Sequence, residues 1–154
     1  MTSTASSRAG LPAEPAPRTE PAPRAEPTGR PCPCGRGEPY GDCCGPFHLG
    51  AANAPSAERL MRSRYSAFVV GDVPYLLATW HPSTRPNELA LKGDRRWLGL
   101  EIVDVRGGGL LDVAGAVEFV AHSVEGGRRV AQSERSRFVR EHGRWFYVDG
   151  VVSA

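Results

Sequence analysis

The 154-residue sequence has almost no lysine, no strongly basic segment and no long apolar run. Of its 19 basic residues only Lys92 is a lysine, and the formal net charge is +2. The first thirty residues carry four arginines and three glutamates, so no basic arm stands out from the rest of the chain. Because nucleic-acid binding depends on clustered positive charge, this balance argues against a nucleic-acid-binding protein.

Two further absences bear on the cellular compartment. No stretch approaches the roughly 20 apolar residues of a transmembrane helix. The N-terminal stretch MTSTASSRAGLPAEPAPR lacks the apolar core of a secretory signal. We therefore expect a cytoplasmic protein without a membrane segment. Thiols stay reduced in that compartment, so a disulfide framework is not expected.

Residues 1–30 contain three related hexapeptides, AEPAPR, TEPAPR and AEPTGR, between Ala13 and Arg30. The prolines fix φ and remove backbone donors, and few apolar side chains are present to offset the entropy of ordering. We expect this segment to be a disordered tether. A polyproline ligand for some partner is the alternative.

All four cysteines lie within one stretch of thirteen residues, in the pattern C-x-C-x8-C-C. A structural zinc site takes four soft ligands in a tetrahedral arrangement. Pro33 and Gly35 flank the second thiol and allow the sharp bend that a C-x-C pair needs. The pattern predicts one zinc ion held by Cys32, Cys34, Cys43 and Cys44. Structural or redox thiols without a metal are the alternative.

Four filled positions leave a zinc ion no open site for water or substrate, so we expect a structural rather than a catalytic ion. His48 is a further candidate ligand, and Cys44 is the thiol that it would replace. Its distance from the tight cysteine spacing favours a solvated loop residue instead. We also expect the rest of the fold to survive the loss of Cys32 or Cys43, because its core does not depend on those thiols.

A helix is predicted over residues 57–70, between a Ser56 cap and Gly71. Apolar side chains recur along it at three- and four-residue spacing and form one stripe: Leu60, Met61, Tyr65, Phe68 and Val69. A second helix is predicted over residues 73–80, and a third, short helix over residues 86–92.

From residue 95 onward β-branched and aromatic residues alternate with turn signals. Four strands are predicted, over residues 95–106, 110–124, 128–142 and 144–152. Glycine-containing turns between them indicate hairpins and hence an antiparallel sheet. Helices followed by a strand meander predict an α+β fold, in which the helices cover one face of a curved four-stranded sheet.

The stretch CPCGRGEPYGDCCG resembles the SEC-C motif, a zinc module in which C-x-C-G-x-G precedes two adjacent ligands. The resemblance implies the same four ligands: Cys32, Cys34, Cys43 and Cys44. The motif usually carries several lysines in its loop, whereas this chain has Glu38, Pro39, Gly41 and Asp42. A basic contact to RNA or to an acidic protein is therefore not expected.

The segments LMRSRYSAF, TWHP, ERSRF and GRWFYVDG are similar to the YchJ family of bacterial proteins. This resemblance covers residues 31–152 and implies a SEC-C zinc motif over 31–50. It implies a domain resembling nuclear transport factor 2, a cone of helices on a bent antiparallel sheet, over 51–154. Such domains often dimerise, so a homodimer is one expected state.

Folds of that kind enclose a cavity between the helices and the sheet, and some members are isomerases or dehydratases. Such chemistry needs a titratable group whose pKa is tuned by burial. Strand alternation predicts that Trp145, Tyr147 and Asp149 share one face of the fourth strand. The candidate cavity residues are His81, Glu118, Glu134, Arg62, Arg64, Tyr147 and Asp149. Each also has a structural explanation, as a helix-end cap or a cross-strand ion pair.

Two functions are consistent with these features. We favour a zinc-binding, non-enzymatic adaptor for a protein or ribosome-associated partner, because the metal site is closed and the sequence has no nucleophile–base pattern or phosphate-binding glycine loop. The alternative is a small-molecule-binding protein, or an enzyme of the lyase or isomerase type, that uses the cavity.

Overall fold

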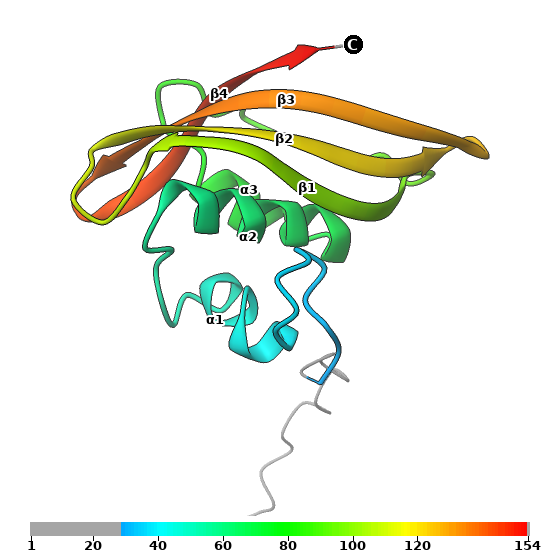
Figure 1. Ribbon diagram of the computed structural model, residues 1–154, viewed down its shortest axis with the longest axis horizontal. Coiled ribbons are helices and arrows are strands. Elements are labelled where there is room, and N and C mark those ends of the chain that lie inside the picture. Colours follow the sequence, from blue (N-terminus) through cyan, green and yellow to red (C-terminus); the bar gives the residue numbers. More distant parts are fainter. Residues whose placement is uncertain (1–28, 154) are drawn as a thin grey trace, which may run out of the picture.

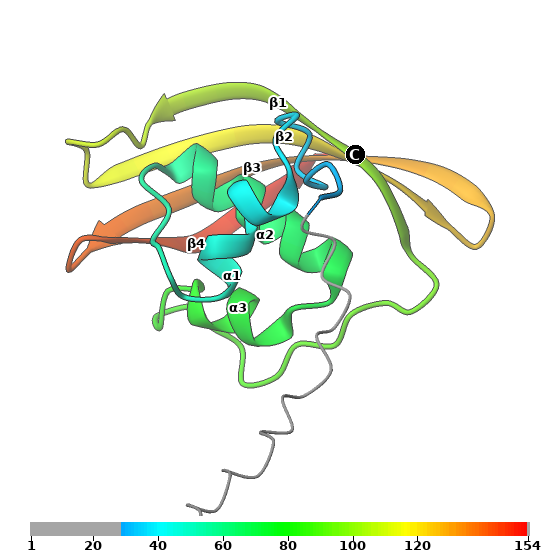
Figure 2. The ribbon, with the colours of Figure 1, turned by 90° about the horizontal axis from the view of Figure 1, so that it is seen from below.

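The computed structural model describes residues 29–153, so the predicted tail over residues 1–30 lies almost wholly outside the described part. A four-stranded sheet forms one layer, helices cover one of its faces, and the cysteine-containing segment packs against those helices (Figures 1 and 2). The elements in chain order are the 3-10 helix η1 (Tyr40–Asp42), α1 (Gly45–His48), α2 (Ala57–Val70), α3 (Val73–Ala78), β1 (Arg96–Gly107), β2 (Ala114–Glu125), β3 (Arg128–Glu141) and β4 (Arg144–Ser153).

Helix α2 begins and ends where the sequence predicts. Ser56 Oγ accepts a hydrogen bond from the backbone N–H of Arg59 at 3.1 Å, which caps the first turn. Gly71 ends the helix in the left-handed conformation, with φ of 78°, that favours glycine. Within residues 29–153 no helix is long and apolar enough to cross a membrane.

Helix α3 ends at Ala78, short of its predicted end. The backbone that follows α3 forms hydrogen bonds with β4 instead of continuing the helix. The N–H of Tyr147 donates to Thr79 O at 2.8 Å, and the N–H of His81 donates to Tyr147 O at 2.7 Å. These tertiary bonds replace the last helical turn. The predicted helix over residues 86–92 is wrong, because this segment is irregular. Unlike α2 and α3, this segment has no capping side chain before it, because Arg85 precedes Pro86 and its guanidinium donates to Trp80 O.

The four predicted strands are present and pair antiparallel in the order β1-β2-β3-β4. The turns at Gly126–Gly127 and His142–Gly143 have positive φ at both positions, as two-residue hairpins require. Strand β2 begins at Ala114 rather than at residue 110. The predicted fold class, α+β with helices on one face of a curved antiparallel sheet, is confirmed (Figure 1).

A β-bulge in β4 changes which of its side chains face the helices. Arg137 pairs with Asp149, whereas Phe138 pairs with Tyr147, so Val148 has no cross-strand partner. The prediction that Asp149 shares a face with Tyr147 is therefore wrong. Asp149 lies on the outer face, where its two carboxylate oxygens accept from Arg137 at 2.7 and 2.5 Å.

The hydrophobic core lies between α2 and the inner face of the sheet. The predicted stripe contributes three core residues, Leu60, Met61 and Tyr65. The Tyr65 ring meets the Trp97 ring edge-on, with 5.5 Å between centroids, whereas Val69 is 37% exposed. The buried surface of α2 extends beyond this apolar stripe. Three polar residues of the helix are also at most 3% exposed: Ser63, Arg64 and Ser66.

A close backbone approach joins the start of α2 to the loop between β1 and β2. The N–H of Ala57 donates to Gly108 O at 3.0 Å. A Cβ placed on Gly115 would lie 2.6 Å from Gly108 Cα and 3.2 Å from Ala57 Cβ. Position 115 therefore has no room for a side chain.

We expect Gly115→Ala to lower the free energy of unfolding by about 1–3 kcal/mol, because backbone atoms rather than a flexible side chain must move. Gly99→Ala is the matched control, since Gly99 also lies within a strand and its added Cβ meets no heavy atom within 4 Å. Urea denaturation of both variants measures the difference. Equal midpoints would contradict the close approach.

Candidate metal centre

The cysteine module, defined here as residues 31–50, folds back on itself at its glycines. The N–H of Cys32 donates to Glu38 O at 2.8 Å, which closes the loop between them. Gly35 and Gly37 have φ of 81° and 86° within that loop, a conformation that favours glycine. The sharp bend of the C-x-C pair was expected at Pro33 and Gly35, and the positive φ values lie at Gly35 and at Gly37.

The second cysteine pair lies where η1 gives way to α1. The N–H of Cys43 donates to Tyr40 O at 3.1 Å, and the carbonyl of Cys44 accepts from the N–H groups of Phe47 and His48, both at 3.1 Å. The turn between the two helices lets the adjacent thiols converge on the first pair.

The four cysteine side chains meet in one buried cluster. Their Sγ atoms all lie within 4.8 Å of one another, and each residue is at most 4% exposed. The Sγ atoms of Cys34 and Cys43 are 3.5 Å apart, and those of Cys43 and Cys44 are 3.9 Å apart. A tetrahedral zinc site with bonds of about 2.3 Å places its thiolates about 3.8 Å apart. The donor set and its spacing therefore fit a zinc ion.

The proximity of the thiols governs their ionisation. Hydrogen bonding from Cys34 lowers the pKa of Cys32. The same interaction, with Cys32 as the ionised partner, raises the pKa of Cys34 to about 11, and Cys32 also raises the pKa of Cys44. One thiolate thus suppresses ionisation of its neighbours. A bound divalent cation is the counter-charge that allows coordinating thiols to deprotonate.

Helix α2 supports the cluster from outside. Ser66 Oγ lies 3.4 Å from Cys32 Sγ, and Arg62 Nη1 donates to Cys34 O at 2.8 Å. The two residues are four apart on α2 and so project from the same face. Hydrogen bonds of this kind orient the ligands of a metal site. From the sequence, Arg62 was expected in the cavity and Ser66 was not identified as a site residue. A serine within an amphipathic helix does not indicate a metal site.

His48 joins the cysteine module to the helices and does not belong to the thiol cluster. Its Nδ1 lies 2.5 Å from the Tyr40 hydroxyl, and its Nε2 lies 2.8 Å from the Ser63 carbonyl. Its ring also packs on Tyr75, with 4.6 Å between centroids. The expectation of a solvated loop residue is wrong, because both ring nitrogens are occupied. Since a carbonyl only accepts, Nε2 carries a proton and donates to Ser63.

Of the cavity candidates, Arg64, Glu134 and Tyr147 come together. The Tyr147 hydroxyl donates to Glu134 at 3.3 Å, and the Arg64 guanidinium lies 4.5 Å from the Tyr147 ring centroid. Arg64 is 3% exposed, and its Nη1 donates to Leu76 O and Thr79 Oγ1, both at 2.7 Å. Burial lowers the pKa of Arg64 to about 10 and raises that of Tyr147 to about 12.

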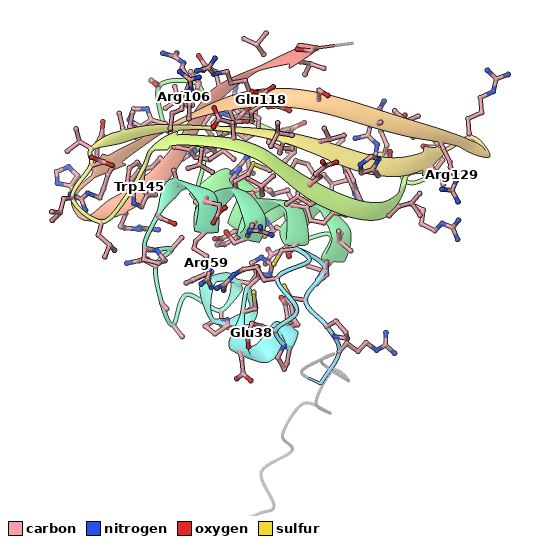
Figure 3. The ribbon with its side chains drawn as sticks, in the orientation of Figure 1. Glu38, Arg59, Arg106, Glu118, Arg129 and Trp145 are labelled. Atoms are coloured by element: carbon pink, nitrogen blue, oxygen red, sulfur yellow. The ribbon has the colours of Figure 1, made fainter. Side chains whose placement is uncertain are left out.

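The other four candidates lie elsewhere. His81 Nε2 is 3.0 Å from Glu141, and Arg62 contacts the cysteine module. Glu118 and Asp149 project from the outer face of the sheet, as Figure 3 shows for Glu118. The predicted seven-residue cavity cluster therefore separates into a group of three, in which Arg64 is buried and Glu134 and Tyr147 are half-buried, and four residues that lie elsewhere.

The sequence of this chain is similar to that of known proteins. A family model described as "YchJ, middle NTF2-like domain" matches residues 56–150. The UPF0225 protein of Streptomyces coelicolor is 57% identical over 113 residues, which cover 73% of this chain and 88% of that protein. The UPF0225 protein of Chromobacterium violaceum is 52% identical over 116 residues, which cover 72% of this chain and 85% of that protein.

Two solved structures share the fold. A SEC-C motif containing protein from Rhodopseudomonas palustris has a TM-score of 0.72 and 34% identity, and the match covers 80% of this chain and 98% of that one. A SEC-C motif containing protein from Psychrobacter arcticus has a TM-score of 0.68 and 30% identity, with 83% and 85% covered.

We expect His48→Ala to lower the free energy of unfolding by about 1–3 kcal/mol, since it leaves the Ser63 carbonyl and the Tyr40 hydroxyl without this partner. It should also speed amide hydrogen exchange within residues 31–50. His122→Ala is the control, because the His122 side chain is 44% exposed. Unchanged amide exchange in the cysteine module of the His48 variant would show that the His48 side chain does not stabilise the module.

Proposed function

This chain belongs to the YchJ family, and from that premise we propose that it is a zinc-binding adaptor. In this proposal the cysteine module holds one structural zinc ion, and the domain that follows binds a protein or ribosome-associated partner in the cytoplasm. The zinc site is supported by the convergence of four buried thiols at the separation that zinc requires.

Zinc would be held by Cys32, Cys34, Cys43 and Cys44. It would supply the positive charge that lets four thiolates share a small buried volume. Four protein ligands leave no coordination position for water or substrate, so its role would be structural. Ser66 and Arg62 then orient the Cys32 side chain and the Cys34 backbone from α2.

A binding role is supported by an exposed apolar loop of the helix-and-sheet domain. The loop between β1 and β2 exposes Leu110 by 69%, Leu111 by 94% and Val113 by 67%. Exposed apolar side chains gathered on one loop are typical of surfaces that contact another protein. The module itself presents the carboxylate of Glu38 outward (Figure 3), which disfavours a nucleic-acid phosphate backbone as the partner.

The group formed by Arg64, Glu134 and Tyr147 supports a second candidate function, the binding of a small molecule between the helices and the sheet. Arg64 is nearly fully buried, yet no carboxylate of residues 29–153 forms an ion pair with it. The Ser136 hydroxyl donates to Glu134 at 3.0 Å, which adds a further polar group. Charged and hydroxyl groups in such a setting are typical of ligand sites.

Native mass spectrometry of untagged protein from its own host tests both functions. The adaptor proposal predicts a mass heavier by one zinc with nothing else bound, and loss of that zinc in Cys43→Ser. A further small-molecule mass that vanishes on denaturation would favour the second function. A metal-free protein with four titratable, reduced thiols would refute the zinc site.

We expect Ser66→Ala to weaken zinc binding about tenfold, because outer hydrogen bonds to a metal ligand contribute roughly 10- to 100-fold to affinity. Competition with a chromophoric zinc chelator measures the change. Ser136→Ala is the matched control, since Ser136 is a buried serine in the sheet that hydrogen-bonds Glu134. Equal zinc affinity in the two variants would exclude a role for Ser66 at the metal site.

A further inference from the structure

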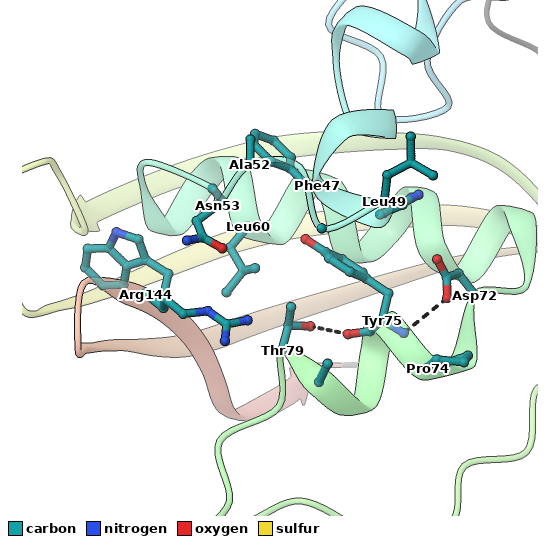
Figure 4. Close-up of a pocket in the computed structure, with 15 residues that line it drawn as sticks. Phe47, Leu49, Ala52, Asn53, Leu60, Asp72, Pro74, Tyr75, Thr79 and Arg144 are labelled. Carbon is teal, nitrogen blue, oxygen red and sulfur yellow. Dashed lines mark hydrogen bonds between the residues drawn. The ribbon is translucent and has the colours of Figure 1, made fainter.

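A cavity of about 290 Å³ lies where four parts of the chain meet, and neither the four cysteines nor Arg64 line it. One wall is α1 and the loop after it, and the others are α2, α3 and the start of β4 (Figure 4). Its volume lies near the lower end of the range of about 300–1,000 Å³ that is typical of small-molecule sites.

The floor of this cavity is apolar and well packed. It is formed by Phe47 from α1, Leu60 from α2 and Trp145 from β4, which are 8%, 2% and 4% exposed. Tyr75 of α3 adds an aromatic ring, and its hydroxyl is already 2.6 Å from Ser63 Oγ. A ligand with a flat or branched apolar part would bury that part here.

Arg144 supplies the positive charge of the cavity. Figure 4 shows its guanidinium extending across the cavity toward Thr79. Arg144 is exposed, and its guanidinium lies 5.6 Å from the Phe146 ring centroid. Among residues 29–153 no carboxylate forms an ion pair with it. The N–H donors of the Arg144 guanidinium are therefore available to a ligand, and two of them can bind both oxygens of one carboxylate.

Two other polar groups belong to the same cavity. Figure 4 shows the Asn53 carboxamide pointing into the space that Arg144 crosses. The indole Nε1 of Trp145 is buried and has no acceptor among residues 29–153, which is uncommon for a buried donor. Asp72 lies toward the other end, but its Oδ1 accepts from the N–H of Tyr75 at 3.1 Å and so caps α3.

We propose that this cavity binds a small organic acid, whose carboxylate pairs with Arg144 and whose apolar part lies on Leu60 and Tyr75. The site goes beyond the adaptor and zinc functions, because it needs neither a partner protein nor an open metal position. It does need the cysteine module in place, since Phe47 of that module forms part of its floor.

Titration of the zinc-loaded, ¹⁵N-labelled full-length protein with sodium benzoate at neutral pH tests the proposal. Benzamide, a neutral molecule of the same shape, is the matched probe. We expect benzoate to shift the Trp145 indole signal saturably and to leave that of Trp97 in place, with benzamide binding about tenfold more weakly, as the loss of a charge-assisted hydrogen bond implies.

Arg144→Gln should weaken benzoate binding about tenfold, for the same loss of a charge-assisted hydrogen bond. Arg129→Gln, an exposed arginine at the far β2–β3 turn (Figure 3), should leave binding unchanged. No shift with either probe, equal affinity for benzoate and benzamide, or full benzoate binding by the Arg144 variant would each overturn the assignment.

Discussion

Helix α2 is the constraint on which the rest of the structure depends, because this single helix of 14 residues packs against α1, α3 and the strands β1, β2 and β4. One side carries Leu60, Met61 and Tyr65 into the core against the sheet. Another carries Arg62 and Ser66 to the cysteine module. A helix surrounded in this way cannot shift to serve one contact without disturbing the others, since protein interiors are close-packed.

The local elements could be predicted because their signals are local. Ser56 and Gly71 delimit α2 through hydrogen bonding and backbone conformation that the residues themselves dictate. The turns at Gly126–Gly127 and His142–Gly143 likewise select two-residue hairpins and hence the strand order. The cysteine spacing, together with the glycines between the pairs, indicates that the four thiols converge. For such features the interacting residues are neighbours in sequence.

What could not be predicted depends on contacts between distant segments. The bulge at Val148 places the Asp149 side chain on the opposite face of the sheet from the one that strand alternation predicts, and no residue pattern in β4 indicates this bulge. The backbone of Thr79 and His81 leaves α3 to pair with Tyr147. His48 is similar: its ring is placed by partners eight and fifteen residues away, so a sequence window around it shows only a polar residue in a loop.

The same long-range contacts bear on how far the module and the domain are separate. Phe47 follows the cysteines in α1, yet it belongs to the core cluster that includes Leu60 and Trp145. Arg59 of α2 packs over the Phe47 ring, with its guanidinium 5.2 Å from the centroid. Loss of order at the thiols would thus expose part of the shared core as well as the metal site. The cysteine module and the helix-and-sheet domain share one core rather than meeting at a solvated boundary, which corrects the expectation that the core of the domain is independent of the cysteine region.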